Sequence, residues 1–422
     1  MSNPVRLGFT GLGSRGGSLL ESCLSMSDVE IAAICNRSDE RREQILARVA
    51  DAGRPSPSTF TDHGTMLSAA NLDGVVISTP WTDHVPMAIE ALEAGVYVGL
   101  EVGAASSVEE CWELVHTAER TGTHCMFLEN TCYFRDCLAI RNMIRAGLFG
   151  ELVHCRCGYG HDLRSSLHRT DASGESLAWR GRQNRHRNAD LYPTHGVGPM
   201  AKVLDVNRGN RFVSLTATAT KSAGLAAYAE ENLDPDHPAA GIDWAIGDVI
   251  TTVLRCANGE TLTVTHDVSL PRPYSNMFHV QGTGGIWKRT FESLSGGEVK
   301  TESAIYLEEE SPGHEWEDFA PYQTGHEHSV WEAYLEAGVK NGHGGIDYLT
   351  LRDYVRHVKR DARPPIDVYD AAAWMAVTPL TEDSIALGGE PVSVPDFTNG
   401  AWMTTEPPVG EPAHEMTADL DL

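Results

Sequence analysis

Short apolar runs alternate with longer amphipathic stretches through the first 150 residues. The amphipathic stretches have helical spacing, as in SDERREQILARVADAG (38–53) and SSVEECWELVHTAERTG (106–122). The apolar runs between them predict buried strands at VRLGFT (5–10), EIAAICN (30–36), DGVVISTP (73–80), VYVGLE (96–101) and THCMFLE (123–129). Strands that alternate with helices of about ten or more residues indicate βαβ units. We therefore expect residues 1–150 to form an α/β domain with a doubly wound parallel sheet.

The pattern changes after residue 150. Residues 151–162 resemble a strand, a polar loop follows, and a helix is expected to begin at Gly196. Runs rich in Val, Thr and Ile then predict short strands at 212–221, 248–256, 260–268, 275–283 and 285–291. Helical patterns return at 327–342, 350–362 and 367–389. We expect a second, α+β domain at 151–405 with a large, mostly antiparallel open sheet for substrate binding and oligomerisation, and a disordered acidic tail at 406–422.

Composition and charge exclude several classes of protein. Hydrophobic residues make up 41% and charged residues 22% of the 422 residues, as in folded globular proteins. Asp and Glu number 59 against 33 Lys and Arg, and the net charge of -26 disfavours nucleic acid and anionic membranes as partners. No apolar run reaches the roughly 18 residues of a transmembrane helix, and the first residues lack the build of a signal peptide. We expect a soluble, cytoplasmic protein.

The cysteines and histidines do not suggest a metal site. The nine cysteines are scattered and form no pair of CxxC units, the spacing that many zinc sites use. They are expected to be reduced thiols packed as small hydrophobic residues. His326 and His328 lie two residues apart near a helix start, so their side chains point to different faces. We therefore expect no bound metal.

A glycine-rich turn follows the first predicted strand. Gly11, Gly13 and Gly16 form the GxGxxG pattern, with Ser14 and Arg15 between the last two glycines. Between a strand and a helix, the first glycine permits the tight turn, the second lets the backbone approach a pyrophosphate, and the third lets the helix pack on the strand. The start of the helix offers N–H groups to the phosphates. These five residues are expected to bind a nicotinamide dinucleotide.

The residue that ends the second strand indicates which ribose such a turn prefers. Asp or Glu there binds the 2′-hydroxyl of NAD, whereas a nearby Arg accepts the 2′-phosphate of NADP. This chain has Asn36 and Arg37 at that place. Asn36 keeps a hydrogen-bonding group without the charge that repels a phosphate. Both residues are expected to contact the cofactor, which is taken to be NAD with NADP still open.

The residues after two later strands resemble those of the Gfo/Idh/MocA oxidoreductases, namely Thr79-Pro80-Trp81 and Glu101-Val102. The resemblance implies a Rossmann domain followed by an α/β domain with a large open sheet. Residues that it places at the cofactor are Thr79, Pro80, Trp81, His84, Glu101 and Asn130. Ordinary members carry Glu-Lys-Pro, whose lysine transfers the proton of the oxidised hydroxyl. This chain reads Glu-Val-Gly at 101–103 and lacks that lysine.

A narrower resemblance accounts for the missing lysine. Glycoside hydrolase family 109, a family of NAD-dependent α-N-acetylgalactosaminidases, has Glu-Val-Pro at this place. It also has segments similar to LENTCYFRD (128–136), GLFGELVH (147–154), YGHDLR (159–164), NADLYPTHGVGP (188–199), QGTGGIW (281–287), DVYDAAAW (367–374) and VPDFTNGAW (394–402). The likeness covers residues 5–405. The chain departs from the family at Gly103, at Asn36 and in a shorter 163–192 loop, which leaves the substrate specificity open.

This resemblance implies a glycosidase that uses tightly bound NAD as a recycled catalyst, outside the usual scheme of two carboxylates. The cofactor oxidises C3 of the sugar transiently, and the ketone acidifies the C2 proton. A base removes that proton, the aglycone leaves from C1, water adds to the double bond, and the ketone is reduced again. Such chemistry needs a base near C2, a proton relay at the C3 hydroxyl and a held nicotinamide.

Two segments carry the candidate catalytic residues. Tyr159 matches the family's C2 base, and a phenol with a pKa of about 10 needs a nearby cation or the oxidised cofactor to act as one. Tyr192 and His195 lie three residues apart where a loop enters a helix, so both can face one cleft, and the imidazole can relay the C3 proton. The expected contacts to the glycoside are Glu129, which could also orient a base, His161, Arg164, Tyr192 and His195.

Two other functions stay open. A sugar or cyclitol dehydrogenase would release NADH, although it would need another proton shuttle. A non-catalytic sugar or nucleotide sensor could share the fold, because fold does not determine function. The joint presence of Tyr159, Tyr192 and His195 disfavours that sensor. The sugar, the aglycone and the anomeric linkage are open, and analogy with the family predicts a homo-oligomer.

Overall fold

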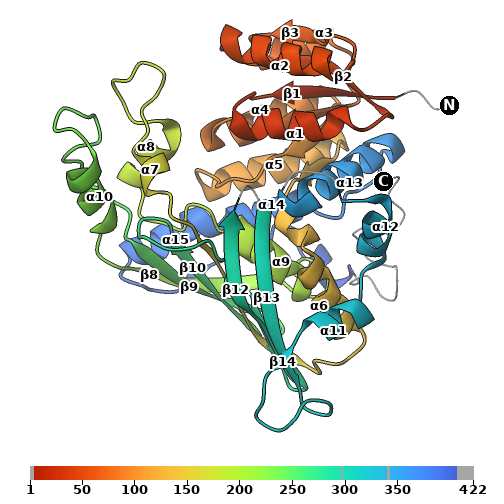
Figure 1. Cartoon of the computed structure of the whole chain (residues 1–422), viewed down its shortest axis with the longest axis vertical. Coiled ribbons are helices and arrows are strands. Elements are labelled where there is room, and N and C mark those ends of the chain that lie inside the picture. The colour runs from red at the N-terminus through yellow and green to blue at the C-terminus, as the bar shows by residue number, and fades with distance from the viewer. Residues whose placement is uncertain (1–3, 296–297, 340–342, 406–422) are drawn as a thin grey trace.

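Two β-sheets organise the chain (Figure 1). The computed structural model describes residues 4–295, 298–339 and 343–405, so the acidic tail expected at 406–422 lies outside the described residues. The first sheet has the strand order β3-β2-β1-β4-β5-β6, and all its pairings are parallel. This is the order of dinucleotide-binding α/β domains, in which ligands bind at the carboxyl edge where the order reverses.

The elements of the first sheet confirm the predicted alternation of strands and helices. The strands are β1 Val5–Thr10, β2 Val29–Cys35, β3 Ser58–Phe60, β4 Gly74–Ile77, β5 Tyr97–Leu100 and β6 Cys125–Phe127. The helices are α1 Ser14–Leu24, α2 Asp39–Asp51, α3 His63–Ala69, α4 Trp81–Glu93, α5 Val108–Thr121, the 3-10 turn η1 Asn130–Tyr133 and α6 Arg135–Arg145. The sequence does not predict β3, which is mostly exposed and lacks an apolar run, or α3, whose seven residues make fewer than two helical turns.

The second sheet has nine strands in the order β14-β13-β12-β11-β7-β10-β9-β8-β15. Their bounds are β7 Leu152–Gly160, β8 Phe212–Ala219, β9 Val249–Cys256, β10 Thr261–Asp267, β11 His279–Gly282, β12 Gly285–Ser295, β13 Glu298–Leu307, β14 Glu317–Asp318 and β15 Val392–Ser393. Only β10 and β7 pair in parallel, so the prediction of a mostly antiparallel sheet is confirmed. Strand β13 was not predicted, because EVKTESAIYL begins with charged residues.

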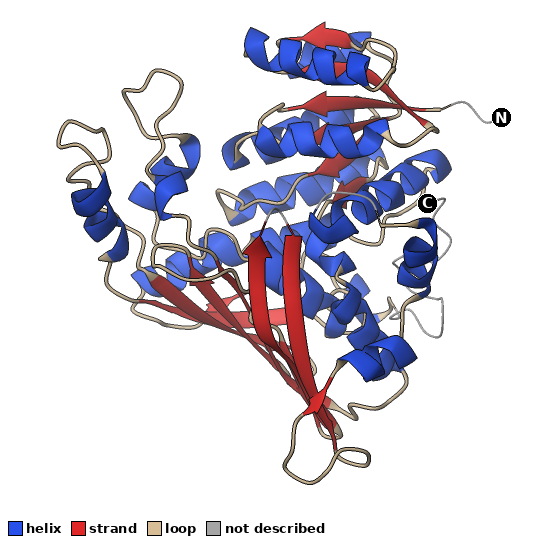
Figure 2. Cartoon of the chain, viewed as in Figure 1, coloured by secondary structure: helices blue, strands red, loops and turns tan. Residues whose placement is uncertain are grey.

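Helices at 194–203 and 377–386 pack on the second sheet, and further helices lie between and after its strands in the chain (Figure 2). Their bounds are α7 Arg164–Leu167, α8 Trp179–His186, α9 Thr194–Val203, α10 Gly224–Asn232, α11 Ala320–Gly325, α12 Ser329–Ala337, η2 His343–Gly345, α13 Ile346–Arg360, α14 Val368–Met375, α15 Val377–Ala386 and η3 Ala401–Met403. Helix α13 packs on α1 and β1, and α14 packs on α5 and β6, so the C-terminal helices join the two sheets. Among the described helices, none has the length and apolar character needed to cross a membrane.

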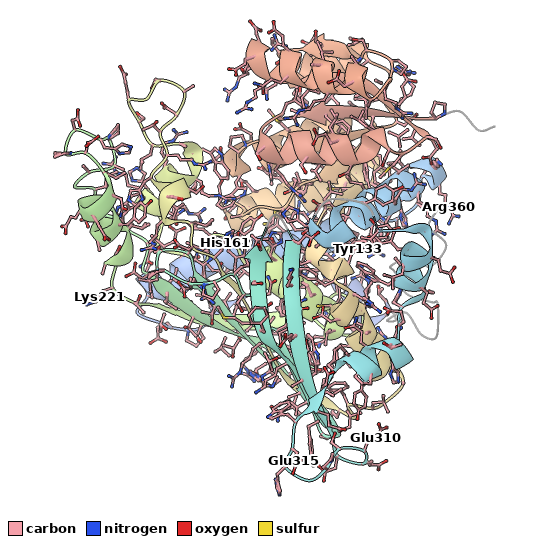
Figure 3. All side chains as sticks on the ribbon, in the orientation of Figure 1. Tyr133, His161, Lys221, Glu310, Glu315 and Arg360 are labelled. Atoms are coloured by element: carbon pink, nitrogen blue, oxygen red, sulfur yellow. The ribbon has the colours of Figure 1, made fainter. Side chains whose placement is uncertain are left out.

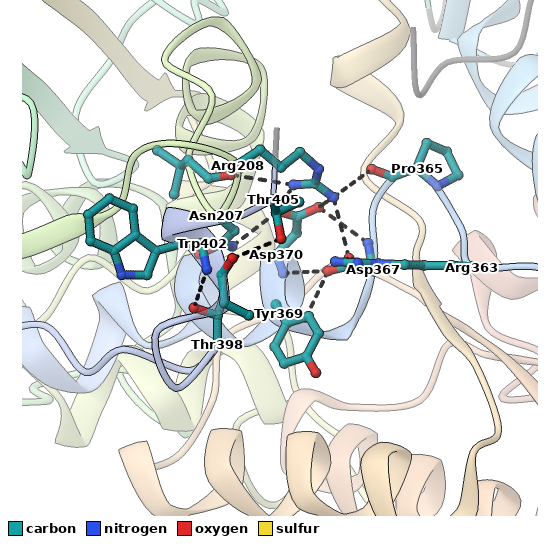
Figure 4. Close-up of polar contacts among 12 residues, drawn as sticks. Asn207, Arg208, Arg363, Pro365, Asp367, Tyr369, Asp370, Thr398, Trp402 and Thr405 are labelled. Atoms are coloured by element: carbon teal, nitrogen blue, oxygen red, sulfur yellow. Dashed lines mark hydrogen bonds and ion pairs between the residues drawn. The ribbon is translucent and has the colours of Figure 1, made fainter. Parts of the chain in front are cut away.

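A buried ionic network joins Asp370 on α14 to Arg208, in the segment before β8 (Figure 4), and also to Lys202 on α9. Both carboxylate oxygens of Asp370 accept hydrogen bonds from Arg208, at 2.9 and 3.0 Å, and one also accepts from Lys202 at 2.7 Å. Burial by itself would raise the pKa of Asp370, but Arg208 and Lys202 hold it well below its usual value. Removal of this carboxylate would leave two buried cations without their main counter-ion.

Replacing Asp370 with asparagine is expected to lower the free energy of unfolding by about 3–5 kcal/mol, the cost of breaking a buried ion pair. The folded pKa is depressed, so this contribution is present above pH of about 4 and is lost as acid protonates the carboxyl. Urea unfolding at pH 7 measures the change, and Asp383→Asn on exposed helix surface is the control. A loss below 1 kcal/mol would contradict the network's role in stability.

Candidate active site

A cavity of about 840 Å³ lies between the glycine-rich turn and the second sheet. His161, which Figure 3 labels, lies on its wall just after β7. The lining residues that the sequence predicted are Gly11, Gly13, Ser14, Arg15, Asn36, Arg37, Thr79, Pro80, Trp81, His84, Glu101, Asn130, Tyr159, His161, Tyr192 and His195. One cavity therefore joins the expected cofactor residues to the expected catalytic residues.

The turn after β1 has the backbone that a dinucleotide requires. Gly11 has φ +88°, and a Cβ there would meet the Ser78 carbonyl at 2.7 Å. A Cβ on Gly16 would lie 1.9 Å from the Gly11 oxygen, so this glycine packs α1 on the turn and does not line the cavity. Gly13 is exposed, has open space where a Cβ would stand, and begins α1 without a side-chain cap. The free N–H groups of this helix start fit a pyrophosphate.

The end of β2 carries polar and cationic groups beside the cavity. Asn36 accepts a hydrogen bond from the backbone N–H of Ser38 at 2.9 Å, through its side-chain oxygen. The Arg42 guanidinium donates to the Asn36 carbonyl, and Arg37 lines the cavity. No carboxylate ends this strand to repel a 2′-phosphate, and two guanidinium groups are close. The carboxylate of Asp62, in the connection between β3 and α3, also lines the cavity.

The Arg15 side chain lines the cavity and is held in an ion-pair cluster. Its guanidinium donates to Glu101 at 2.6 Å and to both oxygens of Asp347 at 2.7 and 3.0 Å. Asp347 also accepts from Asn130 and from His343, each at 2.7 Å. Burial opposes ionisation of Asp347, but Arg15 and His343 hold its pKa well below the usual range. Burial raises the pKa of Glu101, and Arg15 opposes that rise.

His195 at the start of α9 is oriented by a buried carboxylate. Its Nδ1 lies 2.6 Å from Oε1 of Glu129, which also accepts from the Thr131 hydroxyl at 2.7 Å. Burial alone would raise the pKa of Glu129, but His195 and Thr131 bring it below its usual value. The ionised carboxylate favours the tautomer with a proton on Nδ1, which leaves Nε2 as an acceptor. Glu129 does not line the cavity, so its geometry is that of an orienting group.

Three aromatic residues meet around Tyr159 at the end of β7. Its hydroxyl lies 3.0 Å from Nδ1 of His161, and its ring is 4.8 Å from that of Tyr192 and 5.6 Å from that of His195. Burial raises the pKa of Tyr159, whereas the charge of Arg180 lowers it. Burial and then the charge of Glu101 raise the pKa of Tyr192 well above its usual value. The predicted convergence of these side chains in one cleft is present.

Sequence reasoning missed the contribution of the 163–192 segment. Its polarity predicts a loop, but it contains α7 and α8, and α8 brings Trp179 and Arg180 to the cavity wall. The Arg180 guanidinium lies 5.0 Å from the Trp81 ring and 5.3 Å from the Tyr192 ring. Tyr274, in the connection between β10 and β11, also lines the cavity. The sequence WRGRQNRH does not predict that α8 brings Arg180 to the cavity, because the segment lacks a strong apolar face.

Arg164, which was expected to contact the glycoside, does not line the cavity. Its guanidinium binds Asp162 at 2.8 and 2.9 Å and lies over the Tyr228 ring at 5.2 Å.

Helix α9 also begins at Thr194, two residues before the expected start, because His195 is already in the first turn.

Gly103 has a packing reason. A Cβ there would lie 2.5 Å from Cδ1 of Trp81 and 3.0 Å from Nδ1 of His84. Trp81 in turn stacks on Tyr192 at 5.4 Å. Burial lowers the pKa of His84 to about 4, so this imidazole is neutral at pH 7. The glycine therefore makes room for an aromatic wall of the cavity.

Across the described residues, no group of three or more His, Cys, Asp or Glu side chains could hold a metal ion.

Comparison with known proteins matches both parts of the chain. Residues 133–404 match the C-terminal domain of glycosyl hydrolase 109, and residues 5–128 match the NAD-binding Rossmann fold of the Gfo/Idh/MocA oxidoreductase family. A glycosyl hydrolase family 109 protein of Parabacteroides distasonis is 40% identical over 96% of this chain and 89% of its own length. The alpha-N-acetylgalactosaminidase of Tannerella forsythia is 41% identical over 96% of this chain and 88% of its own length.

The fold also has counterparts among solved structures. An NAD binding oxidoreductase from Klebsiella pneumoniae superposes with a TM-score of 0.70 over 94% of this chain and 100% of that one, at 16% identity. At that identity the likeness shows the fold alone. The two domain matches and the relatives at 40% identity confirm the resemblance that the motifs suggested. The chain belongs to glycosyl hydrolase family 109 and is a glycosidase with an NAD-binding Rossmann domain.

Proposed function

We propose that this enzyme is an α-N-acetylgalactosaminidase that cleaves its glycoside by transient oxidation at C3 and elimination across C1 and C2. The observation that carries the proposal is the single cavity that joins the dinucleotide turn to Tyr159, Tyr192 and His195. Val102 lines the same cavity, where a dehydrogenase of this fold would need a proton-transferring lysine. The relative from Tannerella forsythia carries the proposed activity in its name.

Residues of the first sheet hold the cofactor in this proposal. The N–H groups after Gly13 bind the pyrophosphate, and Asn36 and Arg37 lie at the adenosine ribose. Bound NAD would supply the reversible oxidation of the C3 alcohol to a ketone and the reduction of that ketone at the end of each turnover. We propose that the cofactor stays tightly bound between turnovers, and that NADP can also bind because no carboxylate ends β2.

His195 is proposed to accept the proton of the C3 hydroxyl through Nε2. Glu129 holds the tautomer that leaves this nitrogen free, and the His195 ring contacts the Tyr192 ring at the start of α9. Since the carboxylate is buried and ionised, it also stabilises the imidazolium that forms. The same imidazolium returns the proton when the ketone is reduced.

Tyr159 is proposed to take the C2 proton. The Arg180 charge lowers its pKa against the effect of burial, and His161 Nδ1 at 3.0 Å gives its proton a route to solvent. His161, Tyr192 and Arg180 form the polar wall that would contact the sugar hydroxyls and acetamido group. Arg164 is left out of this wall, because its guanidinium is occupied by Asp162.

Replacing Glu129 with glutamine is expected to lower kcat by about 10²–10³-fold, within the range of general acid–base catalysis. The glutamine amide can donate to Nδ1, which favours the tautomer with a proton on Nε2 and removes the acceptor. Steady-state hydrolysis gives kcat, while NAD titration and thermal unfolding check that binding and stability persist. A kcat within threefold of wild type, with an intact fold, would contradict the orienting role.

We further propose how the parts are used in the cell. Residues 1–150 bind the cofactor, and residues 151–405 bind the sugar. The protein acts on small glycosides in the cytoplasm, and it binds neither nucleic acid nor membrane. The nine cysteines, all buried and unpaired by disulfides, support a reducing compartment. Val153, Val253 and Phe291 are 52%, 37% and 50% exposed on strands of the second sheet, which supports assembly of a homo-oligomer through that sheet.

The activity is tested with an aryl α-N-acetylgalactosaminide, with and without added NAD. The expected result is release of the aryl alcohol over many turnovers without accumulation of NADH. The absorbance of the aryl alcohol and that of NADH measure the two quantities. Accumulation of one NADH per sugar would mark a dehydrogenase. Tight NAD binding without turnover on any glycoside of a panel would mark a sensor.

A further inference from the structure

The carboxylate of Asp347 closes a buried cluster at the catalytic end of the cavity. Each oxygen accepts two hydrogen bonds, one from Arg15 and one from either Asn130 or His343. The side chain is fully buried and lies in the first turn of α13, where the helix N-terminus favours a negative charge. The cluster thus contains an ionised carboxylate whose hydrogen-bonding capacity is filled by protein groups.

The cluster lies next to the residues that handle the sugar. Glu101 directly follows β5, binds Arg15 at 2.6 Å and lines the cavity, and its charge raises the pKa of Tyr192. Asn130 follows Glu129, the partner of His195. Because Tyr192 and His195 face the sugar in the proposed function, the cluster flanks the place where nicotinamide and sugar must meet.

The charges at this end of the cavity do not balance. Glu101, Glu129 and Asp347 are three carboxylates, whereas Arg15 and Arg180 are two guanidinium groups. Burial lowers the pKa of His84 to about 4, and burial also lowers the pKa of His161. The carboxylates of this cluster exceed its guanidinium groups by one charge, and burial keeps that charge from being screened by salt.

We propose that this carboxylate cluster makes the site bind the oxidised, positively charged nicotinamide more tightly than the reduced, neutral one. The inference rests on the proposed function and deepens it. A recycled cofactor must begin every turnover oxidised, so preference for NAD+ keeps the resting enzyme ready and drives return of the electrons to the ketone. Asp347 acts here as a positioning residue through Arg15, and its charge adds directly to that of Glu101.

The test is the ratio of the dissociation constants of NADH and NAD+, measured by displacement of fluorescent NADH with NAD+ on the full chain. Asp347→Asn keeps the shape and removes one negative charge, and Val102→Lys adds one positive charge on the cavity wall. Each is expected to lower the preference for NAD+ by about tenfold, as a unit charge at this range would. Asp353→Asn, equally buried on α13 but bound to Tyr133, and Val102→Met are the matched controls and are expected to keep the ratio.

An unchanged ratio in both charge variants would overturn the proposal. Equal weakening of NAD+ and NADH by Asp347→Asn would also overturn it, because a purely structural role affects both forms alike. Failure of the wild type to bind either nucleotide would instead refute the proposed function itself. A wild-type preference for NADH would refute the charge argument while leaving NAD-dependent chemistry intact.

Discussion

Replacing Tyr159 with phenylalanine is expected to lower kcat for glycoside hydrolysis by about 10³-fold, within the range of general acid–base catalysis. The change removes the one oxygen that lies 3.0 Å from His161 and faces the cavity, and it keeps the ring that packs on Tyr192 and His195. Exchange of the C2 proton with solvent should fall in parallel, because both depend on the same base. Steady-state assays and deuterium exchange measure the two effects.

Tyr306→Phe on β13 is the control for loss of a phenol outside the cavity and should leave kcat within about twofold. The stability of Tyr159→Phe should also change little, since its ring contacts remain. Retention of kcat within tenfold would assign the base to another group, for which His161 is the nearest candidate. Loss of hydrolysis with full C2 exchange would mean that Tyr159 acts on the leaving group instead.

Replacing Gly13 with valine is expected to weaken NAD binding by about 100-fold at a small cost in the free energy of unfolding. A Cβ at this position meets nothing within 4 Å, so the folded chain has room for the start of the side chain, and loss of the N-cap glycine costs about 1 kcal/mol. The side chain would stand over the free N–H groups of α1, and loss of two hydrogen bonds to phosphate at about 1.5 kcal/mol each gives this factor. Calorimetric titration with NAD and urea unfolding measure the two quantities.

Gly16→Ala is the contrasting variant. Its Cβ would lie 1.9 Å from the Gly11 oxygen, so the turn or the helix must move, at a cost of about 1–3 kcal/mol in the free energy of unfolding. Gly13→Val should therefore lose cofactor at a small cost in stability, whereas Gly16→Ala should lose some of both. Normal NAD affinity in Gly13→Val would show that the pyrophosphate does not lie on the start of α1.

Much of the fold followed from the sequence because its signals are local. The strands β1, β2 and β4 are nearly continuous apolar runs, and each is followed within a few residues by a turn or by the spacing of an amphipathic helix. The glycine-rich turn was also predictable, because its backbone conformation depends on residues that are adjacent in the sequence. Strand β3 (STF) escaped because it is mostly exposed and has no apolar run, and the seven residues of α3 make fewer than two full helical turns.

The site was predictable only where a motif carries its own geometry. Tyr192 and His195 lie three residues apart, so their convergence needed only the start of α9. Asp347 is 217 residues from Asn130 and 332 from Arg15, and only the packing of α13 on α1 brings them together. Arg180 reaches the cavity from a segment without apolar periodicity. Such long-range contacts leave no trace in the spacing of one sequence.

Hydrolysis of an aryl α-N-acetylgalactosaminide in deuterium oxide, without added cofactor and followed by proton NMR, tests the central claim most directly. The account predicts free sugar that carries deuterium at C2, because the C2 proton leaves and water returns another during each turnover. Release of the sugar with its original C2 proton would contradict oxidation and elimination, even though the glycoside itself had been identified correctly.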